Sequence, residues 1–456
     1  MDSRNFAVIA SAFAFLAGCG GGGSSSTSST TTAPTVVAPT ITFSLSQSKV
    51  ALGSPATLTW SSTDATTCAA SGAWSGVQTA SGTSVQTPAS AGSTTYTLSC
   101  TGAGGVTTKS LALIVPFPVL KSSYENKAVA GEALGSQALP AEVGQGNAVA
   151  FADFFQDGTY SMVTHSLEYN YQDPATSTKF GHIHFWQKVN GVWTDNTSKL
   201  LADNIGCLHP RKAIVADFNG SGRPSIFFAC HGFDASPFPG EQPHLLLSQA
   251  DGTYKNVTIP ITGFFHSAAA ADVDGDGFPD ILVTDNIVQG QPYFLINNKD
   301  GTFTKDLTRL PVSTQYKPIF TAELVNFSST GKYDVFLGGH EQQQSGNWPA
   351  TILPNDGSGA FVTTTPTVLP GLSGYGFPTD FMFVGGNIYL SRTIDLQSNF
   401  YGGTAIQKIT YPALVSQSLF QSTSPFSSGT KWINWIISNA GKIVTMDSLY
   451  GVSVAQ

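Results

Sequence analysis

The stretch Asp272-Val-Asp-Gly-Asp-Gly-Phe-Pro-Asp280 decides the fold of this chain, because it places carboxylates at positions 1, 3, 5 and 9 around two glycines. Ca²⁺ takes roughly six to eight oxygen ligands at about 2.3–2.6 Å, and oxygens at this spacing can wrap one such ion. The two glycines permit the tight turn. The alternative is a solvated acidic turn. The predicted calcium ligands are the side chains of Asp272, Asp274, Asp276 and Asp280, with a backbone carbonyl near Phe278.

The loop is not an EF-hand. An EF-hand has a bidentate Glu at position 12, where this chain has Val283. An EF-hand loop also joins two helices, whereas Ile281–Thr284 after this loop is a short β-rich run. We therefore expect the loop to connect two strands.

The loop belongs to a repeat. Related segments begin at Asp153, Asp217 and Asn326, so that the starting positions 153, 217, 272 and 326 are 64, 55 and 54 residues apart. Two further steps of 54 residues reach Asp380 and Asn434, each in an apolar stretch before a glycine turn. A fixed period of this length is typical of solenoids and propellers, and it predicts six units.

Each of four units carries a second signature after the loop, in which a tight turn separates two apolar runs. Asn-Gly and Asp-Gly at such positions are strong hairpin signals. A unit therefore has four strands, which predicts an all-β fold with a β-propeller of six or seven four-stranded blades. The last unit has only three strands before Gln456, and Val119–Ala130 is expected to add the missing one. The turns are Asn190-Gly191, Asp251-Gly252, Asp300-Gly301 and Ser358-Gly359.

The loop, the Ile-Leu-Val that follows it and the later Asn-x-Asp-Gly-Thr-Phe resemble the FG-GAP/VCBS repeat. Members of that family form calcium-binding β-propellers on bacterial surfaces and in integrin heads, so the resemblance implies a calcium-stabilised propeller over residues 141–456. Only the loop at 272–280 matches the metal pattern fully. The copy at Asp217 has Asn219 and Ser221 at ligand positions, which implies a weaker second calcium site.

The N-terminus predicts the location of the protein. Residues 1–19 have a short apolar region that ends in Leu16-Ala-Gly-Cys19, which resembles a bacterial lipobox. A lipid on Cys19 would then hold the protein to a membrane, and the outer membrane or cell surface of a bacterium is expected. The alternative is an ordinary secretion signal with an incidental cysteine.

Three segments precede the propeller. Residues 20–40 are rich in Gly, Ser and Thr and predict a flexible tether, and residues 41–116 resemble a bacterial Ig-like β-sandwich. Residues 117–140 are expected to be a connector with the closing strand.

The composition indicates which cellular compartment and which classes of partner suit this chain. The net charge of −8 argues against a nucleic-acid partner. Without Cys19 an even number of cysteines remains, which suits an oxidising compartment. We expect the disulfides Cys68–Cys100 and Cys207–Cys230, although two buried thiols are an alternative for the second pair.

Polar residues recur at the strand ends opposite the calcium loops. In a propeller these ends surround the central channel, where they could bind a sugar or organic anion, or coordinate a second metal. The alternative is that such loops are simply polar and hydrated. The predicted ligand-binding residues are His165, His231, His266, Asp285, His340, Arg211, Arg392 and Asp447, and His209 lies nearby.

The predicted function is a lipid-anchored surface protein whose propeller serves in binding or adhesion to a carbohydrate or protein ligand. The sequence has no His-Glu-x-x-His, Gly-x-Ser-x-Gly or P-loop motif. A carbohydrate-active enzyme of the polysaccharide lyase or hydrolase type, with its site at the channel, is the alternative. A component of a surface assembly is a third interpretation.

Overall fold

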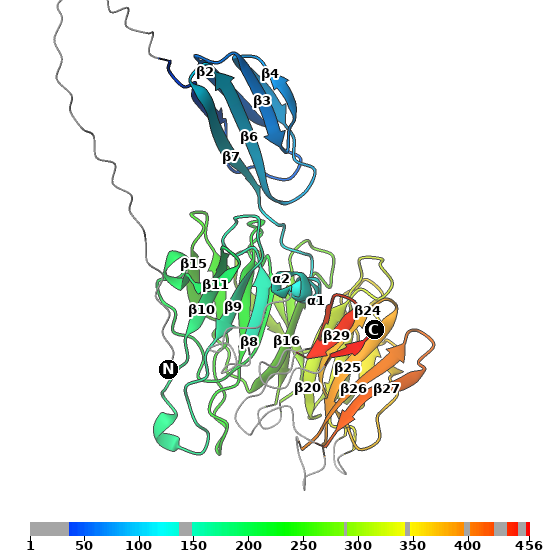
Figure 1. Cartoon of the computed structure of the whole chain (residues 1–456). Coiled ribbons are helices and arrows are strands. Elements are labelled where there is room, and N and C mark those ends of the chain that lie inside the picture. Colours follow the sequence, from blue (N-terminus) through cyan, green and yellow to red (C-terminus); the bar gives the residue numbers. More distant parts are fainter. Residues whose placement is uncertain are drawn as a thin grey trace, which may run out of the picture.

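The computed structural model describes residues 36–135, 148–286, 290–342, 347–395, 402–423, 436–445 and 453–456. Figure 1 shows two bodies built from strands, and two short helices that lie against the inner strands of the C-terminal body. The predictions at Cys19 and Asp447 lie outside the described residues.

The N-terminal body is a β-sandwich. One sheet has the order β1-β2-β5 and the other β4-β3-β6-β7. Buried and exposed residues alternate along β6, where Tyr96, Leu98 and Cys100 point into the core, as period-two strands require. The strands are β1 (Thr40–Leu45), β2 (Ala56–Thr63), β3 (Thr67–Gly72), β4 (Gly76–Gln78), β5 (Ser81–Gln86), β6 (Gly92–Gly102) and β7 (Gly105–Val115).

The predicted disulfide Cys68–Cys100 is present in this body. Its two cysteines lie directly opposite each other on β3 and β6. The bond therefore joins neighbouring strands of one sheet, whereas the antibody-type bridge joins the two sheets.

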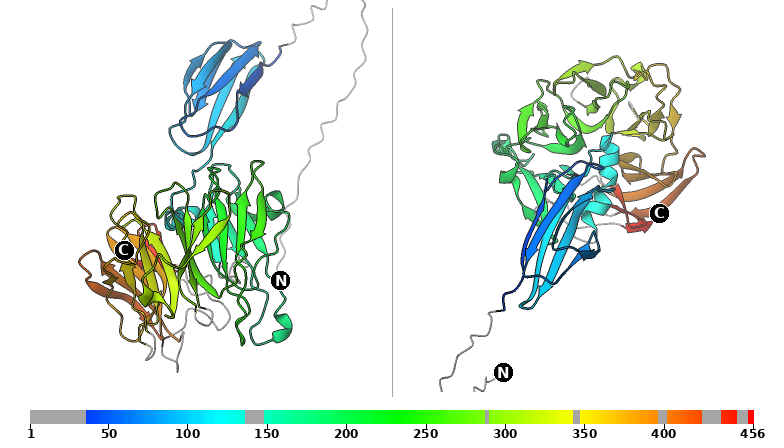
Figure 2. Two further views of the ribbon diagram at one scale, coloured as in Figure 1. Left: turned by 180° about the vertical axis from the view of Figure 1, so that it is seen from behind. Right: turned by 90° about the horizontal axis from the view of Figure 1, so that it is seen from above.

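The C-terminal body is a β-propeller, as the repeat predicts. Among the described residues, five sheets have four antiparallel strands and a sixth has three, β28-β29-β30. Seen from above in Figure 2, the sheets stand in sequence order around a central axis. The first two sheets contain β8 (Ala148–Ala152), β9 (Ser161–His165), β10 (Ile183–Val189), β11 (Val192–Asp195), β12 (Pro210–Ala216), β13 (Ser225–Cys230), β14 (His244–Ser248) and β15 (Tyr254–Thr258).

The other four sheets repeat this order. The third and fourth contain β16 (Phe265–Ala271), β17 (Asp280–Asp285), β18 (Tyr293–Asn297), β19 (Phe303–Asp306), β20 (Ile319–Val325), β21 (Asp334–Gly339), β22 (Thr351–Leu353) and β23 (Thr367–Val368). The fifth and sixth contain β24 (Phe377–Val384), β25 (Asn387–Thr393), β26 (Thr404–Thr410), β27 (Ser416–Ser422), β28 (Ile436–Asn439), β29 (Lys442–Thr445) and β30 (Ser453–Ala455). Single 3₁₀ turns occur at Pro174–Thr176, Thr197–Lys199 and Val312–Thr314.

The core of the propeller lies between neighbouring sheets. Val215 and Phe228 of the second sheet share one apolar cluster with Ala150 and Val163 of the first, and every later interface is built in the same way. The first strand of each sheet lies innermost, because β8, β12, β16, β20, β24 and β28 contact one another in turn. The four alanines of β16 keep this inner wall thin.

The prediction of a closing strand at Val119–Ala130 is wrong, and residues 136–140 of the predicted connector lie outside the described residues. The segment forms two short helices instead, α1 (Ser123–Ala128) and α2 (Ala130–Leu134). The Ser122 hydroxyl caps α1 by accepting the N–H of Glu125 at 3.1 Å, and the Glu125 carboxylate accepts the N–H of Lys121 at 2.9 Å. This exchange is close to a capping box, a local signal for a helix that the repeat count overlooked.

Helix α2 lies between the first and the last described sheets. Ala130 and Leu134 pack in one cluster with Phe151 of β8 and Ile437 of β28. A Cβ atom on Gly131 would lie 2.2 Å from the carbonyl oxygen of Ser438, so the close approach of helix and strand requires glycine. The helix thus packs against the innermost strands of the two sheets, β8 and β28, and not at the outer position where a fourth strand would pair with β30.

Helix α1 enters the central channel from the side of the calcium-type loops. It contacts the inner strands β8, β12, β16, β20 and β28. The Asn126 amide donates to the carbonyl of Val215 at 3.1 Å, and the Ser123 hydroxyl accepts the N–H of Ala270 at 2.8 Å. Deeper in the channel, the Lys127 ammonium contacts the carboxylates of Asp380 at 2.6 Å and Glu323 at 3.5 Å. One mouth of the channel is therefore filled by protein.

Candidate functional site

The loop at 272–280 joins β16 to β17, as expected. Its first residue organises the turn, since the Asp272 carboxylate accepts the N–H groups of Gly275, Asp276 and Gly277 at 2.7–3.0 Å. Gly275 and Gly277 have φ of 80° and 92°, a region that favours glycine. Oxygens of Asp272, Asp274 and Asp276 lie within 4.8 Å of one another. The loop thus brings three of the four predicted carboxylates together.

The carboxylate oxygens of the loop that accept no backbone N–H group suit a hard cation. Asp274 Oδ1 and Asp280 Oδ2 are buried and have no hydrogen-bond partner among the described residues. Burial raises the pKa of Asp280 to about 7, and the nearby charges of Asp274 and Asp276 act in the same direction. Two partnerless carboxylate oxygens beside a cluster of like charges are what a cation site needs. Arg309 and Lys299 offset part of the charge, through contacts of 3.2 Å to Asp274 and Asp276.

The predicted second calcium loop has a different arrangement. Asp217 accepts the N–H groups of Ser221 at 2.9 Å and Gly222 at 2.6 Å, so its carboxylate holds the turn. Asn219 and Ser221 face Ser248, with the Asn219 amide donating to its carbonyl at 3.0 Å and the two hydroxyls 2.8 Å apart. These contacts explain how the loop persists without a full set of ligands.

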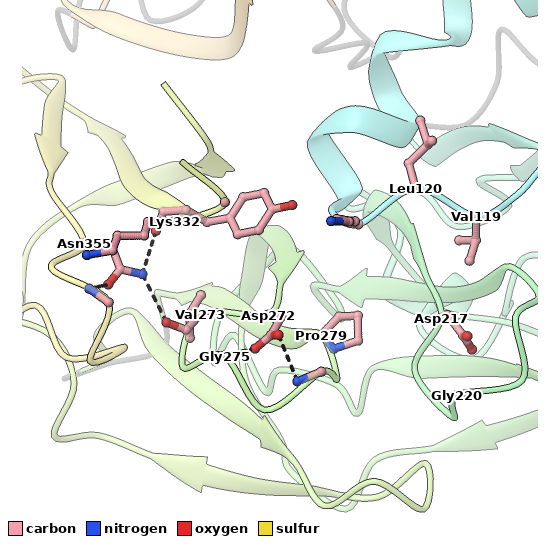
Figure 3. A pocket seen from close by; sticks show the side chains of 15 residues that line it. Val119, Leu120, Asp217, Gly220, Asp272, Val273, Gly275, Pro279, Lys332 and Asn355 are labelled. Carbon is pink, nitrogen blue, oxygen red and sulfur yellow. Dashed lines mark hydrogen bonds between the residues drawn. The ribbon is translucent and has the colours of Figure 1, made fainter. Parts of the chain in front are cut away.

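A groove of about 570 Å³ lies on the face of the calcium-type loops. Figure 3 shows it between the loops of the second, third and fourth sheets and the connector at Val119–Lys121. The wall at Asn355 is fixed, because its amide donates to the carbonyls of Val273 and Tyr333 at 3.1 Å. The lining residues are Val119, Leu120, Lys121, Asp217, Gly220, Asp272, Val273, Gly275, Gly277, Pro279, Gly331, Lys332, Tyr333, Asn355 and Gly357.

The groove was not among the sequence predictions. Its lining comes from turns that are far apart in the chain, and only the ring closure brings them to one face. Five of the lining residues are glycines in or near the turns, which expose backbone groups to the groove. The sequence signal that could have indicated this groove is the glycine that recurs after each acidic position of the loops.

A β-bulge recurs in the inner strands and aims one residue of each at the channel. The strand registers shift at Arg211, His266, Phe320 and Thr379. All four line one small cavity of about 20 Å³ together with Lys127. Bulges often re-aim side chains beside functional sites. A cavity of this size holds about one water molecule rather than an organic ligand.

Three predicted histidines and Phe320 form an aromatic arc at this level of the channel. His231 Nε2 lies 3.0 Å from His266 Nε2. The ring centres of His266 and Phe320 are 4.3 Å apart, and those of Phe320 and His340 are 4.9 Å apart. Burial lowers the pKa of His231, His266 and His340, so these imidazoles are neutral near pH 7. Arg211 and His231 of the second sheet thus lie at one level of the channel with His266 of the third, and their role as ligand-binding residues stays a prediction.

Other predicted ring residues have structural partners. His165 Nδ1–H donates to the Ser166 carbonyl at 2.7 Å, and its Nε2 accepts the N–H of Cys207 at 2.7 Å. Asp285 accepts the N–H of Phe264 at 2.8 Å. The buried Arg392 contacts Glu341 at 2.9 Å and Gln407 at 2.5 Å. These side chains stabilise their own sheets and loops, and no ligand contact is assigned to them.

The second predicted disulfide, Cys207–Cys230, is present beside the arc. It ties the segment before β12 to the end of β13, so His209 and His231 follow its two cysteines closely. The N–H of His231 donates to the carbonyl of His209 at 2.8 Å. Two backbone segments of this face are thus held in a fixed relation.

Comparison with known proteins supports the repeat. Residues 264–286 match the FG-GAP repeat. This FG-GAP segment contains β16, the calcium-type loop and β17. No curated protein sequence matches the chain.

Several solved structures are similar in fold. A GH74 xyloglucanase from Xanthomonas campestris is 14% identical with a TM-score of 0.39, over 68% of this chain and 43% of that one. The periplasmic gluconolactonase of Pseudomonas aeruginosa is 12% identical with a TM-score of 0.36, over 65% and 82%. A puromycin-hydrolysing peptidase of Mycobacterium tuberculosis is 10% identical with a TM-score of 0.34, over 88% and 48%. The chain spans less than half of the xyloglucanase, and likeness at this level assigns no activity.

Proposed function

We propose that this chain is a surface binding module, in which a calcium-stabilised propeller holds a carbohydrate ligand in the groove on its calcium-loop face. The observation that carries the proposal is the position of the groove. Asp272, Gly275 and Gly277 of the FG-GAP loop form part of its lining. An ion held by this loop would therefore order the floor of the groove.

The chemistry of the groove suits a hydroxyl-rich ligand. Its volume of about 570 Å³ falls within the usual range for small-molecule sites, roughly 300–1,000 Å³. Glycine backbones, two carboxylates and two lysines supply donors and acceptors along the lining, and Val119, Leu120, Val273, Pro279 and Tyr333 add apolar surface. Lys121 is exposed at the connector and adds a cation for an acidic sugar. A protein ligand is the competing outcome.

The test is a glycan array with purified protein in calcium buffer, repeated with Lys121→Glu and with Lys179→Glu. Lys179 is exposed in the loop between β9 and β10, away from the groove, and serves as the matched control. We expect Lys121→Glu to weaken binding of an acidic glycan by tenfold or more, and Lys179→Glu to leave it unchanged. Equal binding by wild type and Lys121→Glu, or binding to proteins only, would exclude this site for carbohydrate.

The proposed anchor is a lipid on Cys19. Among the described residues, no helix is long and apolar enough to cross a membrane. A diacylated cysteine followed by the Gly/Ser/Thr tether at 20–40 would carry the two bodies on the outer membrane or cell surface. The two disulfides suit an oxidising compartment.

A single substitution tests the anchor. Cys19→Ser should move the protein from the membrane fraction to the soluble fraction, because the lipid can no longer be attached. Fractionation followed by immunoblotting measures the change, with Cys68→Ser as the control that keeps Cys19. If the Cys19→Ser protein still sediments with membranes after high-salt washing, a partner holds it and the lipid does not.

Two finer structural assignments belong to the same proposal. The order β1-β2-β5 against β4-β3-β6-β7 supports an Ig-like sandwich as the stalk, and the six described sheets support a six-bladed ring that α2 completes. The enzymatic alternative has less support, because Arg392 is buried in contacts with Glu341 and Gln407 and the channel cavity is close to the size of one water molecule. Catalysis would require a base beside a charge-stabilising group with room for a substrate.

A further inference from the structure

A second cluster of metal-ligating groups lies on the channel side, at the opposite ends of the strands from the FG-GAP loop. His209, His231 and Asp234 place one ligand atom each within 4.8 Å of one another. His266 lies beside this cluster, with its Nε2 at 3.0 Å from His231 Nε2. His209 comes from the segment before β12, His231 and Asp234 follow β13, and His266 belongs to β16.

We infer that His209, His231 and Asp234 form a site for a transition-metal dication such as Zn²⁺. Imidazole nitrogens suit zinc, copper, iron and nickel, whereas Ca²⁺ and Mg²⁺ prefer sites made only of oxygens. Two nitrogens and one carboxylate supply three ligands, and a water can take the fourth position, as in three-ligand zinc sites. Ligands at about 2.0–2.1 Å from zinc in a tetrahedron are roughly 3.4 Å apart, so ligand atoms that already lie within 4.8 Å of one another need only a small approach.

The histidine rings are oriented for this role. Tyr169 Oη lies 2.5 Å from His209 Nδ1, a contact that fixes the orientation of this ring. Such a contact to the second ring nitrogen fixes the tautomer of a metal ligand.

The backbone that carries the ligands is fixed on two sides. The Cys207–Cys230 disulfide joins the segments that lead to His209 and His231. The half-buried Glu241 carboxylate accepts the N–H groups of Leu208 at 2.8 Å and His209 at 3.5 Å. Cys207 and Cys230 are consumed by their disulfide, so they are not ligands. Because these contacts already hold the backbone that carries the ligands, the free-energy cost of ordering it on metal binding is smaller.

Arg211 opposes a bound dication. It lies two residues after His209 in the chain and lines one small cavity with His266, so its positive charge repels a bound dication. The carboxylate of Asp234 supplies the opposite charge to the site. Removal of the Arg211 charge should therefore tighten metal binding.

The experiment is a calorimetric titration of Zn²⁺ into EDTA-treated protein that has been returned to calcium buffer, so that the FG-GAP loop is supplied. We expect one Zn²⁺ per chain, and a d–d absorption spectrum of tetrahedral type with Co²⁺. His231→Ala and Asp234→Asn should each weaken Zn²⁺ binding by tenfold or more, and Arg211→Gln should strengthen it. The matched control is His184→Ala, because His184 is half-exposed and contacts Asp195 at 2.8 Å on another strand.

Asp234→Asn keeps the proposal testable if His231→Ala does not fold, because Asp234 lies in a loop and the change keeps the side-chain shape. Zn²⁺ binding that survives both changes, or that falls equally with His184→Ala, would overturn the site. Absence of saturable binding in the wild type would show that the imidazoles of His209 and His231 serve only as packed, hydrogen-bonded side chains. None of these results depends on the carbohydrate groove.

Discussion

Replacing Lys127 with Met should lower the free energy of unfolding of the propeller by about 3–5 kcal/mol, the usual cost of leaving a buried charge without its partner. The Lys127 ammonium is buried and lies 2.6 Å from Asp380 and 3.5 Å from Glu323. It also donates to the carbonyl of Phe381 at 2.8 Å. Met fills the space of the lysine stem, but it leaves the Asp380 carboxylate uncompensated in the channel.

Urea unfolding measures the effect, with Lys179→Met as the exposed control. The double variant Lys127→Met/Asp380→Asn should recover most of the lost stability, because both partners are then neutral. The amide introduced by Asp380→Asn would still offer an oxygen to the N–H of Ile436, which Asp380 accepts at 2.7 Å. Glu323 keeps its contact of 2.6 Å with Lys212 in either variant. A double variant as unstable as the single one would show that packing of α1, rather than charge pairing, is what Lys127 supplies.

Removal of calcium should lower the melting temperature of the wild type. A ligand that binds only the folded state stabilises it by about 2.7 kcal/mol at a hundredfold excess over its dissociation constant. In the calcium-free protein, the buried oxygens of Asp274 and Asp280 have no hydrogen-bond partner among the described residues, and burying them lowers the free energy of unfolding. Differential scanning calorimetry in calcium and in EGTA measures the shift.

A conservative substitution separates this loop from its neighbours. Asp274→Asn should melt at the same temperature with calcium and with EGTA, because one of the clustered charges is gone. Asp217→Asn in the second loop should keep the calcium-dependent shift, since the Asp217 carboxylate mainly accepts backbone N–H groups. A wild-type protein that melts identically in both buffers would mean that Asp272–Asp280 is only a turn.

The repeat in the sequence predicted the sheets well. Period, loop and hairpin signals are local, and each sheet is one such unit, so the loop at Asp272 and the turn at Gly301 could be read directly. The closing element could not be read in this way. The number of strands in the last unit predicted one more strand, whereas the local sequence from Ser122 to Glu125 favours the start of a helix. A helix forms here instead of a strand because its capping contacts are local, and because α2 packs between β8 and β28 without a ladder of backbone hydrogen bonds.

Only part of the channel site could be predicted from the sequence, and the reason differs from that for the closing element. Strand ends indicate which residues approach the axis, so topology predicted that His231, His266 and Arg211 lie on one face, whereas their role in ligand binding stays a prediction. The bulges at Phe320 and Thr379 carry no clear sequence signal, and neither does the loop position of Asp234. His165 and Arg392 stand at strand ends too, yet their hydrogen bonds turn them to neighbouring backbone and side chains.

The measurement that tests the central claim most directly is a calorimetric titration of Ca²⁺ into EGTA-stripped protein, for wild type, Asp274→Asn and Asp217→Asn. We predict one high-affinity site per chain that is lost in Asp274→Asn and kept in Asp217→Asn. The groove lined by the same loop should then bind its glycan only in the two proteins that hold calcium. High-affinity calcium binding that persists in Asp274→Asn, or that is absent from the wild type, would contradict a calcium-ordered groove.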